Sequence, residues 1–218
     1  MPTRRLAAIL CADAIGYSRL MQDDDHHTLE TLKRYRACIS KICVVHNGRV
    51  VNTPGDSILV EFSSAIEAFA AAIEIQDSIK RGNGQLELQR RMYFRIGLDL
   101  GDILVDSDGS VYGNGVNIAA RMQALAGHGG IVMSGKVFDE VSARLQYRFH
   151  ALGRRRVKNI RDRVRAYEFT IAARGTIPTR NCVQRLAEIL SGVLIATADL
   201  FASAGSPGAH GALATRTE

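Results

Sequence analysis

Residues 49–62 read RVVNTPGDSILVEF, and this stretch decides the fold. Two short runs rich in β-branched and apolar residues, Arg49–Asn52 and Ser57–Phe62, flank the tetrapeptide TPGD. Proline and glycine between two such runs favour a turn. The stretch therefore predicts two antiparallel strands joined as a hairpin, with Asp56 in the turn.

Helical patterns lie on both sides of this hairpin. Before it, apolar residues recur near period 3.6 from Leu29 to Ile42, and Asn47-Gly48 then marks a turn. After it, the alanine-rich segment 63–80 has the same periodicity. Farther out, the apolar run Leu6–Cys11 and the alternating stretch Met92–Leu100 predict buried strands. The order β-α-β-β-α-β is the ferredoxin-like plan of the α+β class.

A small α/β extension follows this core and encloses a basic segment. The periodic pattern fades after about Ala173, and Gly, Ala, Ser and Thr dominate from Ala202 onward. We therefore expect one domain, residues 1–173, and a C-terminal tail, residues 174–218, that is a loose helix and then disordered. The elements expected in the extension are helices at 114–125 and 136–145 and strands at 131–133, 149–152 and 165–171.

The composition excludes several classes of protein. The chain has 218 residues, 46% hydrophobic and 23% charged, which is too apolar for a disordered protein and lacks a fibrous repeat. The formal net charge of +6 suggests an anionic partner. Acidic and basic side chains balance over residues 1–152, however, so the whole excess lies in residues 153–218. The positive charge is a local feature, with its densest run between Gly153 and Arg165.

Sequence signals for location favour a cytoplasmic protein. The cysteines form no C-x-x-C pair and no zinc spacing with histidine, which favours reduced thiols in the cytosol. Asp13 interrupts the first apolar run, so this run is unsuitable as a signal peptide. Residues 189–198 are uncharged but reach about half of the roughly 20 residues that a membrane span needs. The cysteines are Cys11, Cys38, Cys43 and Cys182.

Two aspartates are candidate metal ligands. Asp13 directly follows a predicted strand, and Asp56 lies in the predicted hairpin turn. If these strands are neighbours in one sheet, both carboxylates lie at the same edge, where hard cations such as Mg²⁺ would find oxygen ligands. The loop Ala14–Ser18 could direct backbone N–H groups at a phosphate as it enters a helix. A helix-capping role for Asp13 and a turn-forming role for Asp56 are the plainer alternatives.

Asn117 and Arg121 are four residues apart on a predicted helix and therefore share a face. A guanidinium next to a phosphate site can stabilise charge that develops in phosphoryl transfer. By spacing alone, a solvated arginine and a capping asparagine are the better explanation of the pair. Lys158 lies in a basic run, and such runs are more often solvated surface than functional sites. The acidic and histidine-containing cluster at residues 23–27 is likewise more often a solvated loop and helix cap.

Together, five ordered motifs resemble the catalytic domain of the class III adenylate/guanylate cyclases, and most of all the bacterial ones. The resemblance covers roughly residues 4–170, and the order of the motifs makes it highly specific. The motifs are LCADAIGYS (10–18), NTPGDSILVEF (52–62), RIGLDLGD (95–102), VYGNGVNIAARM (111–122) and LGRRRVKNI (152–160).

The resemblance implies a metal and phosphate site. Asp13 and Asp56, with the backbone carbonyl of Ala14, match the family's ligands for two divalent ions, Mg²⁺ or Mn²⁺, per site. Lys158 matches the lysine that contacts the terminal phosphates. The residues that match the triphosphate-binding turn are Ile15, Gly16, Tyr17 and Ser18.

The resemblance also implies a reaction and an assembly. The family converts ATP or GTP to the cyclic nucleotide and pyrophosphate by in-line attack of the ribose 3′-OH on the α-phosphorus. Asn117 matches the residue that orients the ribose, and Arg121 the one that stabilises the transition state. One subunit supplies the aspartates and the other supplies Asn117, Arg121 and Lys158, so a head-to-tail homodimer is implied.

Two positions depart from the family's patterns for reading the base. Asn52 stands where adenylate cyclases have a lysine, and Ser110 where they have aspartate or threonine. Guanylate cyclases have glutamate and cysteine there, so neither pattern is met. Both residues can donate or accept a hydrogen bond. ATP is favoured because bacterial relatives mostly make cyclic AMP, and guanylate or mixed specificity stays open.

Two functions of other classes are alternatives to an enzyme. The altered Asn52 and Ser110 leave open a catalytically weak regulatory or dimerisation module, against which the intact Asp13, Asp56 and Arg121 argue. A nucleic-acid binder is disfavoured, because 6% aromatic residues provide few side chains on which bases could stack.

Overall fold

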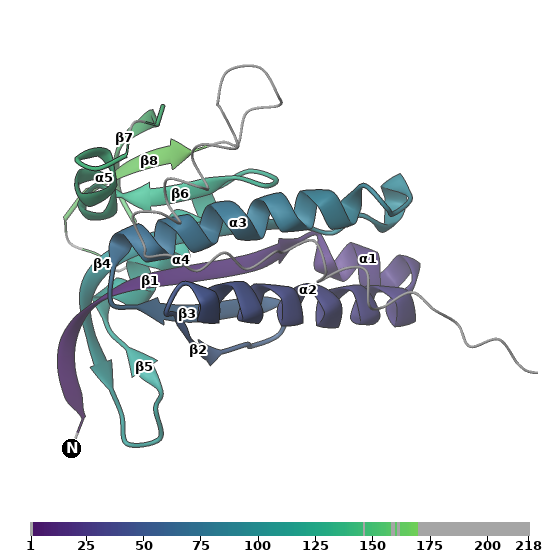
Figure 1. The fold of residues 1–218 in the computed structure, drawn as a ribbon, viewed down its shortest axis with the longest axis horizontal. Helices are drawn as coiled ribbons and strands as arrows, with labels where there is room; N and C mark the ends of the chain where they lie inside the picture. Colours follow the sequence, from purple (N-terminus) through teal and green to yellow (C-terminus); the bar gives the residue numbers. More distant parts are fainter. Residues whose placement is uncertain (1, 146, 158–159, 161, 170–218) are drawn as a thin grey trace, which may run out of the picture.

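In the computed structural model, which describes residues 2–145, 147–157, 160 and 162–169, eight strands form one sheet flanked by helices (Figure 1). The elements in chain order are β1 (Thr3–Ile15), α1 (Tyr17–Asp23), α2 (Asp25–Val45), β2 (Arg49–Asn52), β3 (Ser57–Phe62), α3 (Ala65–Asn83), the 3₁₀ helix η1 (Leu88–Arg90), β4 (Tyr93–Val105), β5 (Val111–Tyr112), α4 (Asn114–Leu125), β6 (Ile131–Ser134), α5 (Gly135–Ser142), β7 (His150–Arg155) and β8 (Val164–Phe169).

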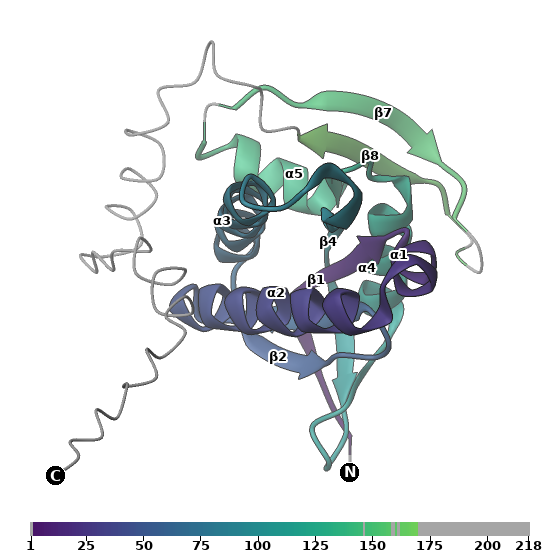
Figure 2. The same cartoon turned by 90° about the vertical axis from the view of Figure 1, so that its right-hand side faces the viewer.

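The strand order confirms the ferredoxin-like plan. The hairpin forms as β2 and β3 with the predicted bounds, and the sheet runs β2-β3-β1-β4-β6-β8-β7, with β5 paired to β4. Its first four strands are antiparallel neighbours, and β4 and β6 are parallel. The extension adds β6, β8 and β7, and Figure 2 shows β7 and β8 as a curved pair beside α5.

A long two-strand ladder crosses the domain. β1 and β4 are 13 residues each and pair from Thr3 opposite Val105 to Ile15 opposite Tyr93. The hydrophobic pattern predicted only residues 6–11 of β1 and ended the second strand at Leu100, five residues before the end of β4. The strands are longer because backbone hydrogen bonds extend the ladder past the apolar residues that mark it in the sequence.

The two faces of β1 have different neighbours. Ala8 and Leu10 are fully buried in the main core with residues of α2 and α3, which cross the sheet in front of β1 and β3 in Figure 1. Ile9 belongs to a second buried cluster on the opposite face, with Ala119 of α4. Asp13 has the same parity as Ile9, so its carboxyl group emerges on the α4 face.

Glycine allows α4 to lie close to the sheet. A Cβ at Gly97 of β4 would stand 2.1 Å from both the carbonyl oxygen of Ala119 and the backbone nitrogen of Gln123. No side chain fits there unless the helix moves, since the obstacle is backbone. The position of α4 fixes where Asn117 and Arg121 lie.

The loop at residues 14–18 was expected to enter a helix, but the sequence pattern set no bounds for helix α1. Gly16 precedes it with a φ of 70°, in the left-handed region, and turns the chain out of β1. The seven residues of α1 show too little apolar periodicity to be recognised, and only Leu20 is buried.

Candidate active site

Asp13 and Asp56 meet at one edge of the sheet. Strands β1 and β3 are antiparallel, and Asp13 lies opposite Ser57, the residue after Asp56. A tight turn closed by the Ser57 N–H and the Pro54 carbonyl at 2.9 Å presents Asp56. Gly55 adopts a φ of 56° there, which a side chain would strain. The expected convergence of the two carboxylates is therefore present in the fold.

Asp56 is half-buried and lies close enough to Asp13 to be affected by its charge. Burial raises the pKa of Asp56 above its usual range, and the negative charge of Asp13 raises it further. The Arg36 and Arg95 guanidinium groups act in the opposite direction. A pair of carboxylates close enough to repel is a suitable site for a divalent cation.

Asp13 has three hydrogen-bond donors around it. The Ser57 hydroxyl donates to Oδ1 at 2.6 Å, and Arg95 Nη2 of β4 forms an ion pair with Oδ2 at 2.9 Å. Gln123 of α4, which is buried, donates to Oδ2 at 3.3 Å. Sequence reasoning missed all three. The register of β1 and β4 places Arg95 directly opposite Asp13, and that register was the signal that could have identified it.

The oxygen atoms of this site are suitable ligands for a hard divalent ion. Asp13 and Asp56 supply carboxylate oxygens, which Mg²⁺ and Mn²⁺ prefer, and the adjacent backbone of Ala14 offers a carbonyl. A magnesium ion in a phosphoryl-transfer site needs only one or two carboxylates, because substrate phosphates complete the coordination.

The loop after Asp13 runs from the end of β1 into α1. Ile15 is the last strand residue and Tyr17 the first helical one, with Gly16 exposed between them. The N-terminus of α1 has no side-chain cap. Ser18 is exposed on its first turn. The predicted phosphate-binding turn is thus adjacent to the two aspartates in the fold, as its sequence position requires.

A second group of predicted site residues faces away from these aspartates. Asn117 and Arg121 are exposed on α4, whereas Gln123, on the opposite side of the same helix, contacts Asp13. Arg121 lines a basic pocket of about 480 Å³ with the end of β7. The pocket is lined by Arg121, Ala124, Leu125, Arg154, Arg155, Arg156, Val157 and Arg163.

The basic pocket is anchored by Val157. This residue is 7% exposed and packs with Met122 of α4 in a small apolar cluster. The packing of Val157 against Met122 places the arginines of residues 154–156 beside Arg121. Lys158 lies outside the described residues.

The two base-reading candidates have fixed hydrogen-bond partners. Asn52, at the end of β2, accepts the Thr53 backbone N–H on its amide oxygen at 2.7 Å. The Ser110 hydroxyl donates to Asp108 Oδ2 at 2.9 Å. Arg49 Nη1 of β2 donates to the Gly109 carbonyl at 3.1 Å and connects β2 with the loop that carries Ser110.

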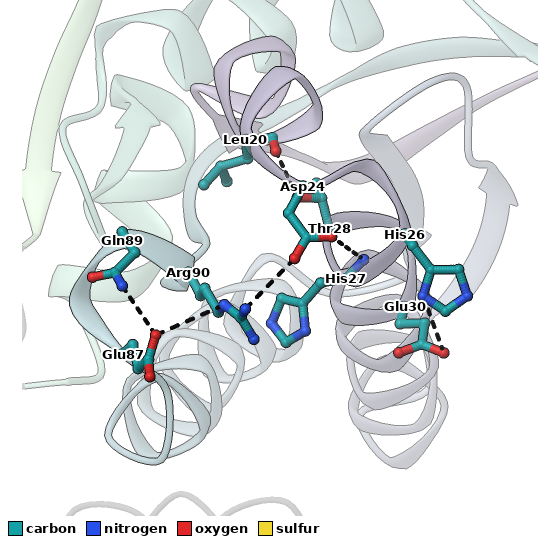
Figure 3. A network of polar contacts seen from close by, with 9 residues as sticks. All are labelled: Leu20, Asp24, His26, His27, Thr28, Glu30, Glu87, Gln89 and Arg90. Carbon is teal, nitrogen blue, oxygen red and sulfur yellow. Dashed lines mark hydrogen bonds and ion pairs between the residues drawn. The ribbon is translucent and has the colours of Figure 1, made fainter.

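The acidic and histidine-containing cluster at residues 23–27 has a structural role. Asp24 caps α2 by accepting the His27 backbone N–H at 3.0 Å and lies 3.6 Å from Arg90, as Figure 3 shows. Among the described residues, no three His, Cys, Asp or Glu side chains form a group that could hold a metal ion. The described helices also include none with the length and hydrophobicity of a membrane span.

Comparisons with known proteins agree with this geometry. The family model of the adenylate and guanylate cyclase catalytic domain matches residues 2–171. "Putative adenylate cyclase 3" of Rhizobium meliloti (strain 1021) is 40% identical over 177 residues, and an "Adenylate cyclase" of Streptomyces coelicolor (strain ATCC BAA-471 / A3(2) / M145) is 28% identical over 127 residues. These matches cover 80% and 58% of this chain, but only 30% and 31% of those proteins.

Solved structures share the fold. The "Adenylate/Guanylate Cyclase/Hydrolase" of Silicibacter pomeroyi is 35% identical with a TM-score of 0.73, over 79% of this chain and all of that one. The adenylyl cyclase CyaB of P. aeruginosa, 20% identical with a TM-score of 0.69 over 80% of this chain and 98% of that one, supports the fold alone. The family match over residues 2–171, together with the convergence of Asp13 and Asp56, shows that this chain belongs to the adenylate/guanylate cyclase catalytic domain family.

Proposed function

We propose that this chain is an adenylate cyclase that converts ATP to cyclic AMP and pyrophosphate with divalent metal ions, at sites shared across a head-to-tail homodimer. The observation that carries the proposal is the convergence of Asp13 and Asp56 at one sheet edge, with Arg121 in a basic pocket on another side. We further propose that the catalytic domain is residues 1–173 and that residues 174–218, which lie outside the described residues, form a tail.

Each protomer would contribute half of a site. Gln123 ties the inner side of α4 to Asp13, while Asn117 and Arg121 are exposed on its outer side. These two side chains would therefore reach the aspartates of a second copy. Ile15–Ser18 would bind the triphosphate beside the aspartates, and the partner's Lys158 would contact its terminal phosphates.

The chemistry follows from positioning and charge. Asp13, Asp56 and the Ala14 carbonyl would hold the metal ions, which lower the pKa of the ribose 3′-OH and offset phosphate charge when bound. Asn117 would orient the ribose so that the 3′ oxygen is in line with the bond to the leaving group. The new bond joins the 3′ oxygen to the α-phosphorus, the bond from this phosphorus to the bridging oxygen breaks, and pyrophosphate leaves. Arg121 would offset charge on the α-phosphoryl oxygens.

Hydrogen-bond polarity supports ATP over GTP. The amide oxygen of Asn52 already accepts the Thr53 N–H, which favours the NH₂ group as the group that contacts the base. The Ser110 proton is directed at Asp108, so the hydroxyl oxygen is left to accept. A donor for N1 and an acceptor for the 6-amino group complement adenine. Guanine presents the opposite polarity, an N1–H donor and an O6 acceptor.

A cyclase assay tests the proposal. Purified protein is incubated with Mn²⁺ or Mg²⁺ and either ATP or GTP, and both cyclic nucleotides are measured. We expect cyclic AMP from ATP and its loss in Asp13→Ala. No product from either nucleotide would favour the regulatory module instead. Predominant cyclic GMP would refute the assignment of the base.

The shared site has its own test. Asp56→Ala and Arg121→Ala proteins are each expected to be inactive. A mixture should regain partial activity, because a dimer of the two contains one site with all its residues intact. If the mixture stays inactive while wild-type protein mixed in the same way is active, the sites are not shared between chains.

A further inference from the structure

Helix α2 reaches across to the turn that carries Asp56 through one side chain. Arg36 Nη2 donates to the backbone carbonyls of Thr53, at 3.1 Å, and Ser57, at 3.4 Å. The same nitrogen also donates to the carbonyl of Gly55. One guanidinium from another element therefore binds carbonyls on both sides of Asp56.

The other side-chain hydrogen bonds of this turn lie at its two ends, where the Thr53 N–H donates to Asn52 Oδ1 and the Ser57 hydroxyl donates to Asp13 Oδ1. Its own backbone closes through the bond from the Ser57 N–H to the Pro54 carbonyl. Thr53, Pro54 and Gly55 are exposed, and Asp56 is half-buried. Hydrogen bonds from a charged donor are roughly twice as strong as neutral ones, so Arg36 is a major restraint on the turn.

We propose that Arg36 is a positioning residue for the metal site: it fixes the turn so that the Asp56 carboxylate stands at the distance from Asp13 that a divalent ion requires. The inference rests on the proposed metal-binding function of these two aspartates. Residues that orient metal ligands without touching the metal commonly have a large effect on metal affinity when they are substituted.

Geometry and charge predict opposite effects of removing Arg36. A nearby positive charge repels a divalent cation, so its removal would tighten metal binding if charge were all that mattered. Loss of the hydrogen bonds to the turn would instead release Asp56 and weaken metal binding. Whether Mn²⁺ binding becomes weaker or tighter therefore distinguishes the positioning role from a simple effect of charge.

The experiment measures Mn²⁺ binding to the full chain without nucleotide, by the electron paramagnetic resonance signal of free Mn²⁺. Arg36→Met keeps the apolar stem and removes the donors, and Arg36→Lys keeps the charge and part of the donor capacity. Lys33→Met is the matched control, because Lys33 is exposed on the same helix one turn earlier. Hydrogen exchange of the backbone amides of Thr53 and residues 55–57 reports on the turn in each variant, and circular dichroism confirms folding.

We expect Arg36→Met to weaken Mn²⁺ binding about tenfold, within the usual range for such residues. Arg36→Lys should lie between it and wild type, and Lys33→Met should match wild type. Exchange of the turn amides should rise in Arg36→Met, including under conditions where the fold is intact.

Unchanged or tighter Mn²⁺ binding by a folded Arg36→Met would overturn the role of Arg36. If Arg36→Met does not fold, Arg36→Lys is used in its place. The proposal is then refuted if the turn amides of Arg36→Lys lose their protection while its Mn²⁺ affinity stays equal to that of wild type. Asp13→Asn and Asp56→Asn are measured in parallel. If neither of them weakens Mn²⁺ binding, the proposed metal site fails; if both do and Arg36→Met does not, only the inference about Arg36 fails.

Discussion

A single methyl group added at Gly97 should displace α4. This helix contacts Asp13 through Gln123 and carries Asn117 and Arg121 on its exposed side. In Gly97→Ala the new Cβ would stand 2.1 Å from the backbone of α4, whereas ordinary contact begins at 3.4 Å. The helix must therefore retreat by about 1.3 Å. Overpacking costs about 1–3 kcal/mol when side chains can adjust. Because backbone is the obstacle here, we expect the upper end, about 3 kcal/mol.

The same displacement should lower activity. It would break the contact of Gln123 with Asp13 and move Asn117 and Arg121, and a misplacement of about 1 Å can cost roughly 100-fold in rate. A loss of about 3 kcal/mol lowers the unfolding midpoint by roughly 6–12 °C in a chain of this size.

The assay is cyclic AMP formation beside thermal unfolding followed by circular dichroism. Gly127→Ala is the control, because Gly127 follows the same helix and a Cβ there has nothing within 4 Å. A Gly97→Ala protein that equals Gly127→Ala in both midpoint and rate would refute the argument from close packing.

Two further changes test buried charge and base selection. Asp99 is 1% exposed, its carboxyl oxygens have no aligned hydrogen bond, and burial raises its pKa. The folded state therefore holds its proton more strongly than the unfolded state, and wild-type stability should fall as pH rises through the folded pKa. Asp99→Asn should match wild type in acid and be more stable at pH 7 by about 1 kcal/mol in urea titrations; equal pH dependence would contradict this. Asp108→Ala should free the Ser110 hydroxyl to donate and lower the ATP-to-GTP rate ratio about tenfold, the effect of about 1.4 kcal/mol, and an unchanged ratio would remove Asp108 from base selection.

Local patterns were sufficient for most of the fold. The turn at residues 53–56 predicted both strands of its hairpin with the observed bounds, and the periodicity of α4 predicted that helix to the residue. The ends of β1 and β4 were underestimated, because the ladder between them extends into polar sequence. The bounds of helix α1 could not be assigned, because it is short and buries only Leu20.

The candidate site was predictable only in part, and for a related reason. The convergence of Asp13 and Asp56 was expected on the condition that their strands are neighbours, and the pairing of β1 with β3 meets this condition. The donors around Asp13 come from other elements, and Arg95 and Gln123 could be placed only once strand register and helix packing were known. The contact of Arg36 with the turn could not be predicted for the same reason. Nothing in the sequence of α2 or of the turn indicates that this helical arginine binds there.

Under the proposed function, the outward-facing side of α4 would make catalysis depend on the encounter of two molecules. In the proposed assembly, no isolated protomer contains a whole site, since Asn117 and Arg121 project away from Asp13. Below the dissociation constant of the dimer, the number of whole sites falls with the square of the protein concentration. Cyclic nucleotide output would then rise more steeply than the amount of enzyme. A process that only brings two copies together would thereby switch on synthesis without altering a single catalytic side chain.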